Sequence, residues 1–187
     1  MTALAEECSD ILRGEHRQVR DLLLGAIEAA QEGSPVRMRA PLGEIAALTG
    51  PHFRYEEEAL YPLLTSIFKP EYVEHLLGAH DDAIAAARRL VELAGQRSLS
   101  DGEAREAVGP LRGILPHVSD CDGLSIMVEL LDEPDVQVIL DTRERSLVAG
   151  LDLLEWADRA RSRPTLREPA AQGGAAGAAE GLPAVRV

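Results

Sequence analysis

The chain has 187 residues, of which 45% are hydrophobic and 3% aromatic, and its 19 basic and 32 acidic residues give a formal charge of −13. A single domain with so large an apolar fraction can form a core, which excludes a wholly disordered chain. The acidic balance argues against binding to nucleic acid or to an anionic membrane surface, because both would repel the chain. No apolar run is long enough to span a bilayer. The N-terminal residues lack the basic and apolar regions of a secretory signal, so we expect a cytoplasmic protein with free thiols at Cys8 and Cys121.

Helical periodicity runs through most of the chain. The spacing of apolar residues predicts four helices at about 4–31, 40–68, 71–95 and 102–132. They are separated by breaks at Gly33-Ser34-Pro35, Lys69-Pro70, Gly95 and Pro134. No window alternates as a strand would. Long helices with short connections predict an all-α fold, an up-down-up-down four-helix bundle over residues 1–133.

Two further segments follow the predicted bundle. Residues 135–162 keep the helical spacing and predict an additional helix within 134–163, which we expect either to cap the bundle or to form a homodimer contact. Residues 164–187 hold seven Ala, four Gly and three Pro and have no hydrophobic period. We expect that segment to be a disordered tail, because it cannot bury enough surface to offset its chain entropy.

Four of the five histidines fall into a repeated pattern. His16 and His80 each follow a Gly-x pair in the first and third predicted helices, whereas His52 and His117 each follow a proline in the second and fourth. His52 lies 36 residues after His16, and His117 lies 37 residues after His80. In an antiparallel bundle, one histidine from each of the four helices can therefore meet in the core.

The second helix adds a carboxylate at a useful spacing. Residues four apart lie one turn above one another on a helix, so His52 and Glu56 can reach one centre. Histidines and carboxylates in a dry core need compensation, which a cation supplies and two cations bridged by carboxylates supply better. Imidazole and carboxylate together suit iron, with zinc and manganese as alternatives. We expect Glu57 and Glu58, which follow, to lie on a solvated face.

The fourth helix offers two candidates for a further ligand. Asp122 lies five residues after His117, about 140° around a regular helix, and reaches the same face only through a π-turn. Pro116 and Gly123 favour such a turn by weakening the regular ladder. A regular turn offers Cys121 instead. We favour Asp122, because a thiolate bound to a ferric centre is prone to oxidation, and keep Cys121 as the alternative.

These motifs resemble those of the hemerythrin-like family, also called the HHE cation-binding domain. The resemblance covers about residues 8–132 and is carried by GEH at 14–16, PHFRYEEEALYPLL at 51–64, LGAHDDA at 77–83 and PHVSDCD at 116–122. It implies a four-helix bundle that holds a non-haem centre of two iron ions, oxo- or hydroxo-bridged. By the same resemblance, the two irons would be bridged by Glu56 and Asp122 and capped by His16, His52, His80 and His117.

One departure from the family pattern bears on function. Oxygen-carrying members have a further histidine in the third helix, where this chain has Leu76, and the nearby His75 lies about 140° from His80 on a regular helix. Fewer protein ligands leave an open coordination position, which favours reaction with a small molecule over reversible carriage of oxygen. The resemblance therefore implies a protein that binds or reacts with O2, peroxide or NO at an open iron site.

Two other functions stay open at this point. One is a di-iron oxidase or oxygenase that acts on a small organic metabolite. The other is a helical interaction module without catalysis, in which metal only staples the bundle. The sequence does not distinguish a carrier or sensor from an enzyme.

Overall fold

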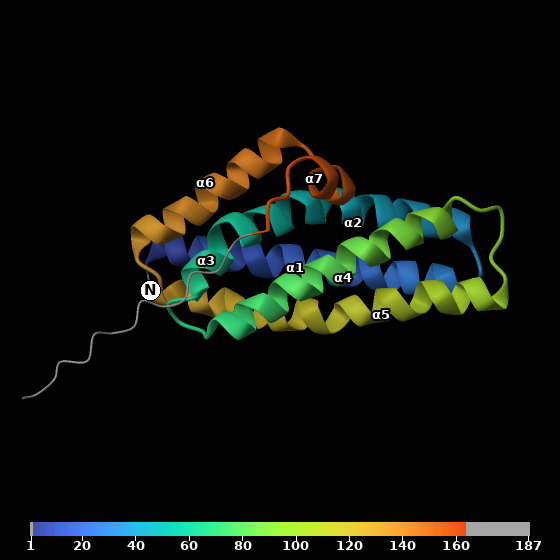
Figure 1. Ribbon diagram of the computed structural model, residues 1–187, viewed down its shortest axis with the longest axis horizontal. Helices are drawn as coiled ribbons and strands as arrows, with labels where there is room; N and C mark the ends of the chain where they lie inside the picture. The colour runs from blue at the N-terminus through green and yellow to red at the C-terminus, as the bar shows by residue number, and fades with distance from the viewer. Residues whose placement is uncertain (1, 164–187) are drawn as a thin grey trace, which may run out of the picture.

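Four long helices form an antiparallel bundle (Figure 1) in the computed structural model, which describes residues 2–163. They are α1 (Ala3–Gln31), α2 (Pro35–Tyr55), α4 (Pro70–Ala94) and α5 (Asp101–Leu124). Both α2 and α5 pack against α1 and against α4, and no strand occurs among the described residues. The predicted all-α, up-down-up-down bundle is confirmed. The predicted tail, 164–187, lies outside the described residues.

Local signals determine where the helices begin and end. The side chain of Thr2 accepts a hydrogen bond from Ala5 at the start of α1, and Ser100 forms a capping box with Glu103 at the start of α5. Pro35 begins α2, because a proline at the first helical position lacks only an N–H that has no helical partner. The second helix therefore starts before the predicted residue 40.

The second and fourth predicted helices each change geometry before they end. The α2 helix passes into a π-helical turn, η1 (Glu56–Leu60), and then into the short α3 (Tyr61–Leu64). The α5 helix passes into a 3-10 segment, η2 (Ser125–Leu130). None of the helices over residues 2–163 has the length and apolar character needed to cross a lipid bilayer.

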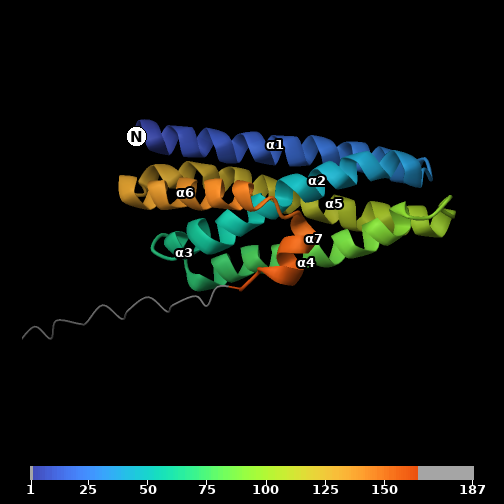
Figure 2. The ribbon, with the colours of Figure 1, turned by 90° about the horizontal axis from the view of Figure 1, so that it is seen from above.

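The segment predicted as an additional helix within 134–163 is helical, and a turn divides it into two helices, α6 (Glu133–Ala149) and α7 (Leu153–Arg159). Gly150 ends α6 with a left-handed φ of 61°, and Asp152 starts α7 in a capping box with Glu155. The two helices lie on the outer side of α2 (Figures 1 and 2), where α6 packs against α1, α2 and η1, and α7 packs against α2 and α4. A homodimer contact through this segment stays a prediction.

Gly50 allows the linker between α6 and α7 to lie directly against α2. A Cβ atom at this position would come within 2.6 Å of the backbone carbonyl carbon of Asp152, so only glycine fits there. Beside this contact, Leu153 and Trp156 of α7 pack in one buried cluster with Phe53 of α2. The close backbone approach therefore docks α7 on the bundle.

Two larger hydrophobic clusters fill the two ends of the bundle. Along α1, the first cluster ends at Leu12 and the second begins at Val19. On α4, the first cluster contains Leu77 and the second begins at Leu90. The middle of the bundle lies between these clusters, and polar side chains occupy it.

Candidate metal centre

Four histidines, one from each long helix, meet in the middle of the bundle. His16, His52, His80 and His117 are all at most 8% exposed. The rings of His16 and His52 lie edge to face with centroids 4.8 Å apart, and those of His80 and His117 do the same at 4.9 Å. The Nε2 atoms of His16 and His52 are 3.1 Å apart. The structure thus brings together the four histidines that the repeated pattern singled out.

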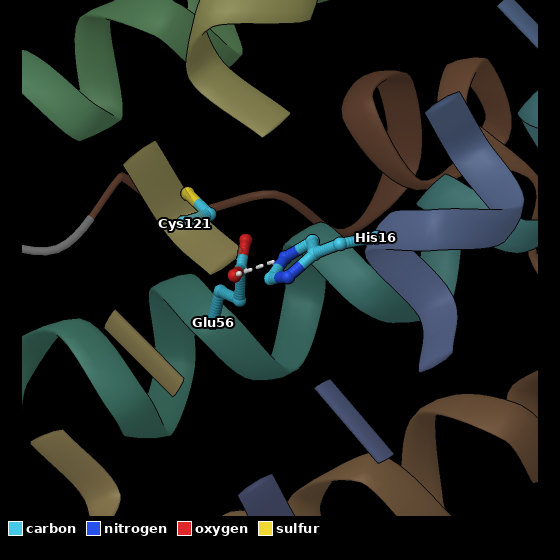
Figure 3. A group of neighbouring side chains, drawn as sticks. All are labelled: His16, Glu56 and Cys121. Atoms are coloured by element: carbon cyan, nitrogen blue, oxygen red, sulfur yellow. Dashed lines mark ion pairs between the residues drawn. The ribbon is translucent and has the colours of Figure 1, made fainter. Parts of the chain in front are cut away.

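Glu56 lies between the two pairs of histidines and is 1% exposed. Its Oε1 atom is 3.6 Å from Nε2 of His16 and 3.4 Å from Nε2 of His52, and its Oε2 atom is 3.1 Å from Nε2 of His80. Figure 3 shows the His16 ring directed at this carboxylate. Burial raises the pKa of Glu56, but the charge on His52 and the nearby imidazoles of His16, His52 and His80 outweigh burial and hold this pKa well below its ordinary value.

The π-turn lies in the second helix and not in the fourth, where we expected it. It begins at Glu56, whereas α5 stays α-helical from Asp101 to Leu124. The prediction of a π-turn between His117 and Asp122 was wrong, because the loss of the one N–H at Pro116 leaves the rest of the α-helical ladder intact.

The regular geometry of α5 brings Cys121 to the centre and leaves Asp122 at its edge. Cys121 is 2% exposed, and its Sγ atom lies 3.6 Å from Nε2 of His117 and 3.6 Å from the hydroxyl of Tyr61. The side chain of Asp122 is 49% exposed, but its Oδ1 atom is buried and lies 4.0 Å from Nδ1 of His16. Both candidates from the fourth helix therefore lie beside the histidines.

The donor atoms at the centre fit a cation. His16 Nδ1, Glu56 Oε1 and Asp122 Oδ1 are buried and have no hydrogen-bond partner among the described residues. Leaving a buried polar atom without a hydrogen bond costs about 1–3 kcal/mol, and such atoms are rare in folded proteins. A bound cation would remove that cost. Two groups of donor atoms, each within 4.8 Å of one another, share Glu56. The groups are His16, Glu56 and Cys121, and Glu56, His80 and His117.

Two more buried carboxylates orient the histidines, a role that no residue spacing in the sequence indicated. Glu15 Oε2 accepts a hydrogen bond from His52 Nδ1 at 2.7 Å, and Glu57 Oε1 accepts one from His80 Nδ1 at 2.9 Å. The expectation of a solvated Glu57 was wrong, because the π-turn leaves both Glu56 and Glu57 1% exposed. Burial raises the pKa of Glu15, but His52, with Tyr55 and Arg143, lowers it to about 2.

Two spaces adjoin the centre. An apolar cavity of about 60 Å³ has His16, His52 and His117 in its wall. The rest of its wall is mainly apolar and includes Val19, Ala46, Ala87, Leu111, Ile114 and Leu153. An open groove of about 750 Å³ between α4 and α5 also has His117 in its wall, and the exposed His75, which belongs to neither group of donor atoms, lies along it.

Two histidine pKa values predict how the stability of the metal-free chain depends on pH. Burial and the charge of His80 lower the pKa of His117 to about 3. Its stabilising contribution is therefore present above the unfolded pKa of about 6.5 and is lost as the pH falls toward 3. Burial lowers the pKa of His52, but Glu56 and Glu15 raise it to about 10, so its contribution is present below 6.5 and is lost as the pH rises through 10.

We therefore expect the free energy of unfolding of the metal-free chain to be highest near pH 6.5 and to fall in both directions, by up to about 1.4 kcal/mol per pH unit for each histidine. The melting temperature should fall with it. Circular dichroism melts between about pH 4 and pH 10 measure it. In the zinc-loaded chain the alkaline fall should disappear, because the ion replaces the proton on His52. A melting temperature of the metal-free chain that is constant from pH 6.5 to 10 would contradict the raised pKa of His52.

Comparison with known protein families connects this geometry to a described domain. The family described as the hemerythrin HHE cation binding domain matches residues 9–120. The matched region contains His16, His52, Glu56, His80 and His117 and ends before Cys121, Asp122, α6 and α7. No curated protein and no solved structure matches the chain.

Proposed function

The chain belongs to the hemerythrin HHE cation-binding family, and from this premise we propose that it holds two iron ions in the middle of its bundle and reacts there with O2, NO or peroxide. The family and the donor set support a metal centre. The observation that carries the proposal of two ions is Glu56, whose two oxygens face different histidines and which belongs to both groups of donor atoms. A carboxylate in that position is suited to bridge two cations.

The distribution of charge also supports cations at this place. Glu15 and Glu57 each form an ion pair with an arginine, whereas Glu56 is surrounded by imidazoles, the hydroxyl of Tyr61 and the thiol of Cys121 and pairs with no arginine or lysine among the described residues. A buried carboxylate needs a positively charged partner. In the metal-free chain that partner is a protonated imidazole, and in the loaded chain it would be the metal ions. Histidine and carboxylate donors suit iron. In the proposed centre, His16 and His52 would hold one ion and His80 and His117 the other, and Glu56 would be shared by both.

Asp122 remains our prediction for the second carboxylate ligand, supported by its buried, unpartnered Oδ1 atom. Burial and Glu56 raise the pKa of the competing Cys121 thiol well above its ordinary value, which disfavours the thiolate. We expect Asp122→Asn to lower iron affinity by more than tenfold, and Cys121→Ser to leave it nearly unchanged. Iron affinity is measured by competition with a chelator. The reverse pattern would assign the position to Cys121.

The apolar cavity supports a small uncharged molecule as the reactant. Its volume of about 60 Å³ exceeds the roughly 10–15 Å³ that a single water needs, so it admits a molecule of a few atoms. The apolar wall favours O2 or NO over an ion and keeps water away from the buried imidazoles. When bound, iron supplies the electrons for such chemistry by cycling between its ferrous and ferric states.

Stopped-flow mixing tests the proposal. The chain is loaded anaerobically with ferrous iron, its metal content is measured by mass spectrometry, and it is mixed in turn with O2, NO and hydrogen peroxide. We expect about two irons per chain and a rapid change in near-ultraviolet absorption with at least one reagent. Ala87→Leu, which narrows the cavity at a residue outside the donor set, should slow the reaction with O2 but leave iron loading unchanged. Full loading without any spectral change would favour a bundle that metal only staples.

The groove between α4 and α5 favours a second candidate function, oxidation of a small organic molecule by O2. The groove is large enough for a metabolite and reaches His117, and its wall includes the carboxylates of Asp81, Asp82 and Asp120. Such an enzyme would consume O2 in proportion to an added organic substrate. Consumption of O2 limited to the amount of bound iron, with every organic compound tested, would reject this candidate.

A further inference from the structure

We propose that Arg143 and Arg161 are positioning residues of the metal centre, each holding the carboxylate that orients one metal-facing histidine. Both arginines lie in the segment 133–163, which contains α6 and α7 and follows the region that the family matches. The C-terminal segment would then be a functional part of the centre rather than only a cover for the bundle. This inference rests on the metal centre of the proposed function.

The first connection runs from α6 to His52. Arg143 donates to Glu15 Oε1 through Nε at 2.8 Å, and its Nη2 lies 2.7 Å from the same oxygen. The other oxygen of Glu15, Oε2, accepts hydrogen bonds from His52 Nδ1 and from the hydroxyl of Tyr55, each at 2.7 Å. Glu15 is 9% exposed, so Arg143 is its neutralising partner from outside the bundle.

The second connection runs from Arg161, which follows α7, to His80 and has the same form. Arg161 donates to Glu57 Oε1 through Nη2 at 2.8 Å and to Glu57 Oε2 through Nε at 3.0 Å. Glu57 Oε1 in turn accepts the hydrogen bond from His80 Nδ1 at 2.9 Å. The Arg161 side chain is 13% exposed and is also held by Asp81, at 2.6 Å from Nη1.

Both connections have the same chemical consequence. A carboxylate only accepts hydrogen bonds, so Nδ1 of each histidine carries the proton. The Nε2 lone pair of His52 and that of His80 are then free to face the centre, where Glu56 lies 3.4 Å and 3.1 Å away, respectively. Without the arginine, each carboxylate would keep an uncompensated buried charge and would turn toward water. Mutation of a carboxylate that orients a metal-binding histidine typically lowers metal affinity by about 10- to 100-fold.

The variants Arg143→Ala and Arg161→Ala test the proposal, with Arg88→Ala as the matched control. Arg88 forms an exposed ion pair between α4 and Asp158 of α7, so its loss weakens the same interface without touching the centre. The emission of Trp156, the single tryptophan of the chain and 1% exposed, reports whether α7 stays docked. Ferrous iron affinity is measured by competition with a chelator, and zinc-loaded chains give NMR signals for the histidine Nδ1 protons.

Each arginine should affect its own histidine. We expect each alanine variant to bind iron about 10- to 100-fold more weakly than the wild type, with Trp156 emission unchanged. In the zinc form, Arg143→Ala should shift or remove the Nδ1 proton signal of His52 and leave that of His80, and Arg161→Ala should do the converse. Arg143→Lys and Arg161→Lys keep the positive charge and should recover part of the iron affinity. If an alanine variant does not fold, the iron affinity of the lysine variant is compared with that of the wild type instead.

Three results would overturn the inference, and they are distinct from a failure of the proposed function. They are wild-type affinity in both alanine variants, an equal loss in Arg88→Ala, or changes in both histidine signals together with a red shift of Trp156. A wild-type chain that takes up neither iron nor zinc would instead reject the metal centre itself, and this inference with it.

Discussion

Glu56→Gln is expected to abolish iron loading, with the iron content of the chain falling from about two ions to none. Glutamine keeps the shape of the side chain but removes the negative charge, and its amide cannot bridge two cations as a carboxylate does. Both groups of donor atoms use Glu56, so both should lose their ion together. The measurement is metal analysis by mass spectrometry after loading and desalting.

Thermal unfolding gives a second measure of the same change. Metal that binds only the folded chain stabilises it by mass action, by about 4 kcal/mol at a free concentration 1,000 times the dissociation constant. For a chain of this size that corresponds to a rise in melting temperature of roughly 8–16 °C, which Glu56→Gln should lack. Glu58→Gln is the matched control, because Glu58 lies in the same turn but pairs with Arg54 at the surface. Two irons per chain in Glu56→Gln would contradict the bridging role.

Gly50→Ala is expected to destabilise the chain by about 1–3 kcal/mol and to detach α7 from α2, because overpacking against backbone cannot relax by a rotamer change. The added Cβ would lie 2.6 Å from the carbonyl carbon of Asp152. The linker over residues 150–152 must then move, and Trp156 should become exposed. Chemical denaturation measures the loss of stability, and a red shift of tryptophan emission measures the detachment.

Gly43→Ala provides the control in the same helix. No atom lies within 4 Å of a Cβ built at Gly43, so the substitution should stabilise α2 by up to about 1 kcal/mol through the helix propensity of alanine. Equal effects of the two substitutions would show that the backbone contact at Gly50 does not hold α7. A loss of iron affinity in Gly50→Ala alone would be consistent with the role proposed for Arg161.

The bundle and the meeting of four histidines could be predicted because both follow from local periodicity. Apolar residues at helical spacing determine the buried face of each helix, and His16 and His80 lie on those faces. Glu56 shares a face with His52 by the same rule. The break between α6 and α7 was also readable, from Gly150 and from the capping box of Asp152 with Glu155, although the apolar spacing continues across it.

The helices, the four buried histidines and the carboxylate one turn after His52 therefore follow from the order of the residues. The packing of the helices was needed to learn that the π-turn starts at Glu56, that Cys121 and Asp122 both lie beside the histidines, and that two arginines reach the carboxylates behind them. Arg143 contacts a glutamate 128 residues away, and Arg161 one 104 residues away. Helical periodicity relates residues within one helix. Which side chains meet across helices depends on how the helices rotate and pack, and no spacing along the chain encodes that.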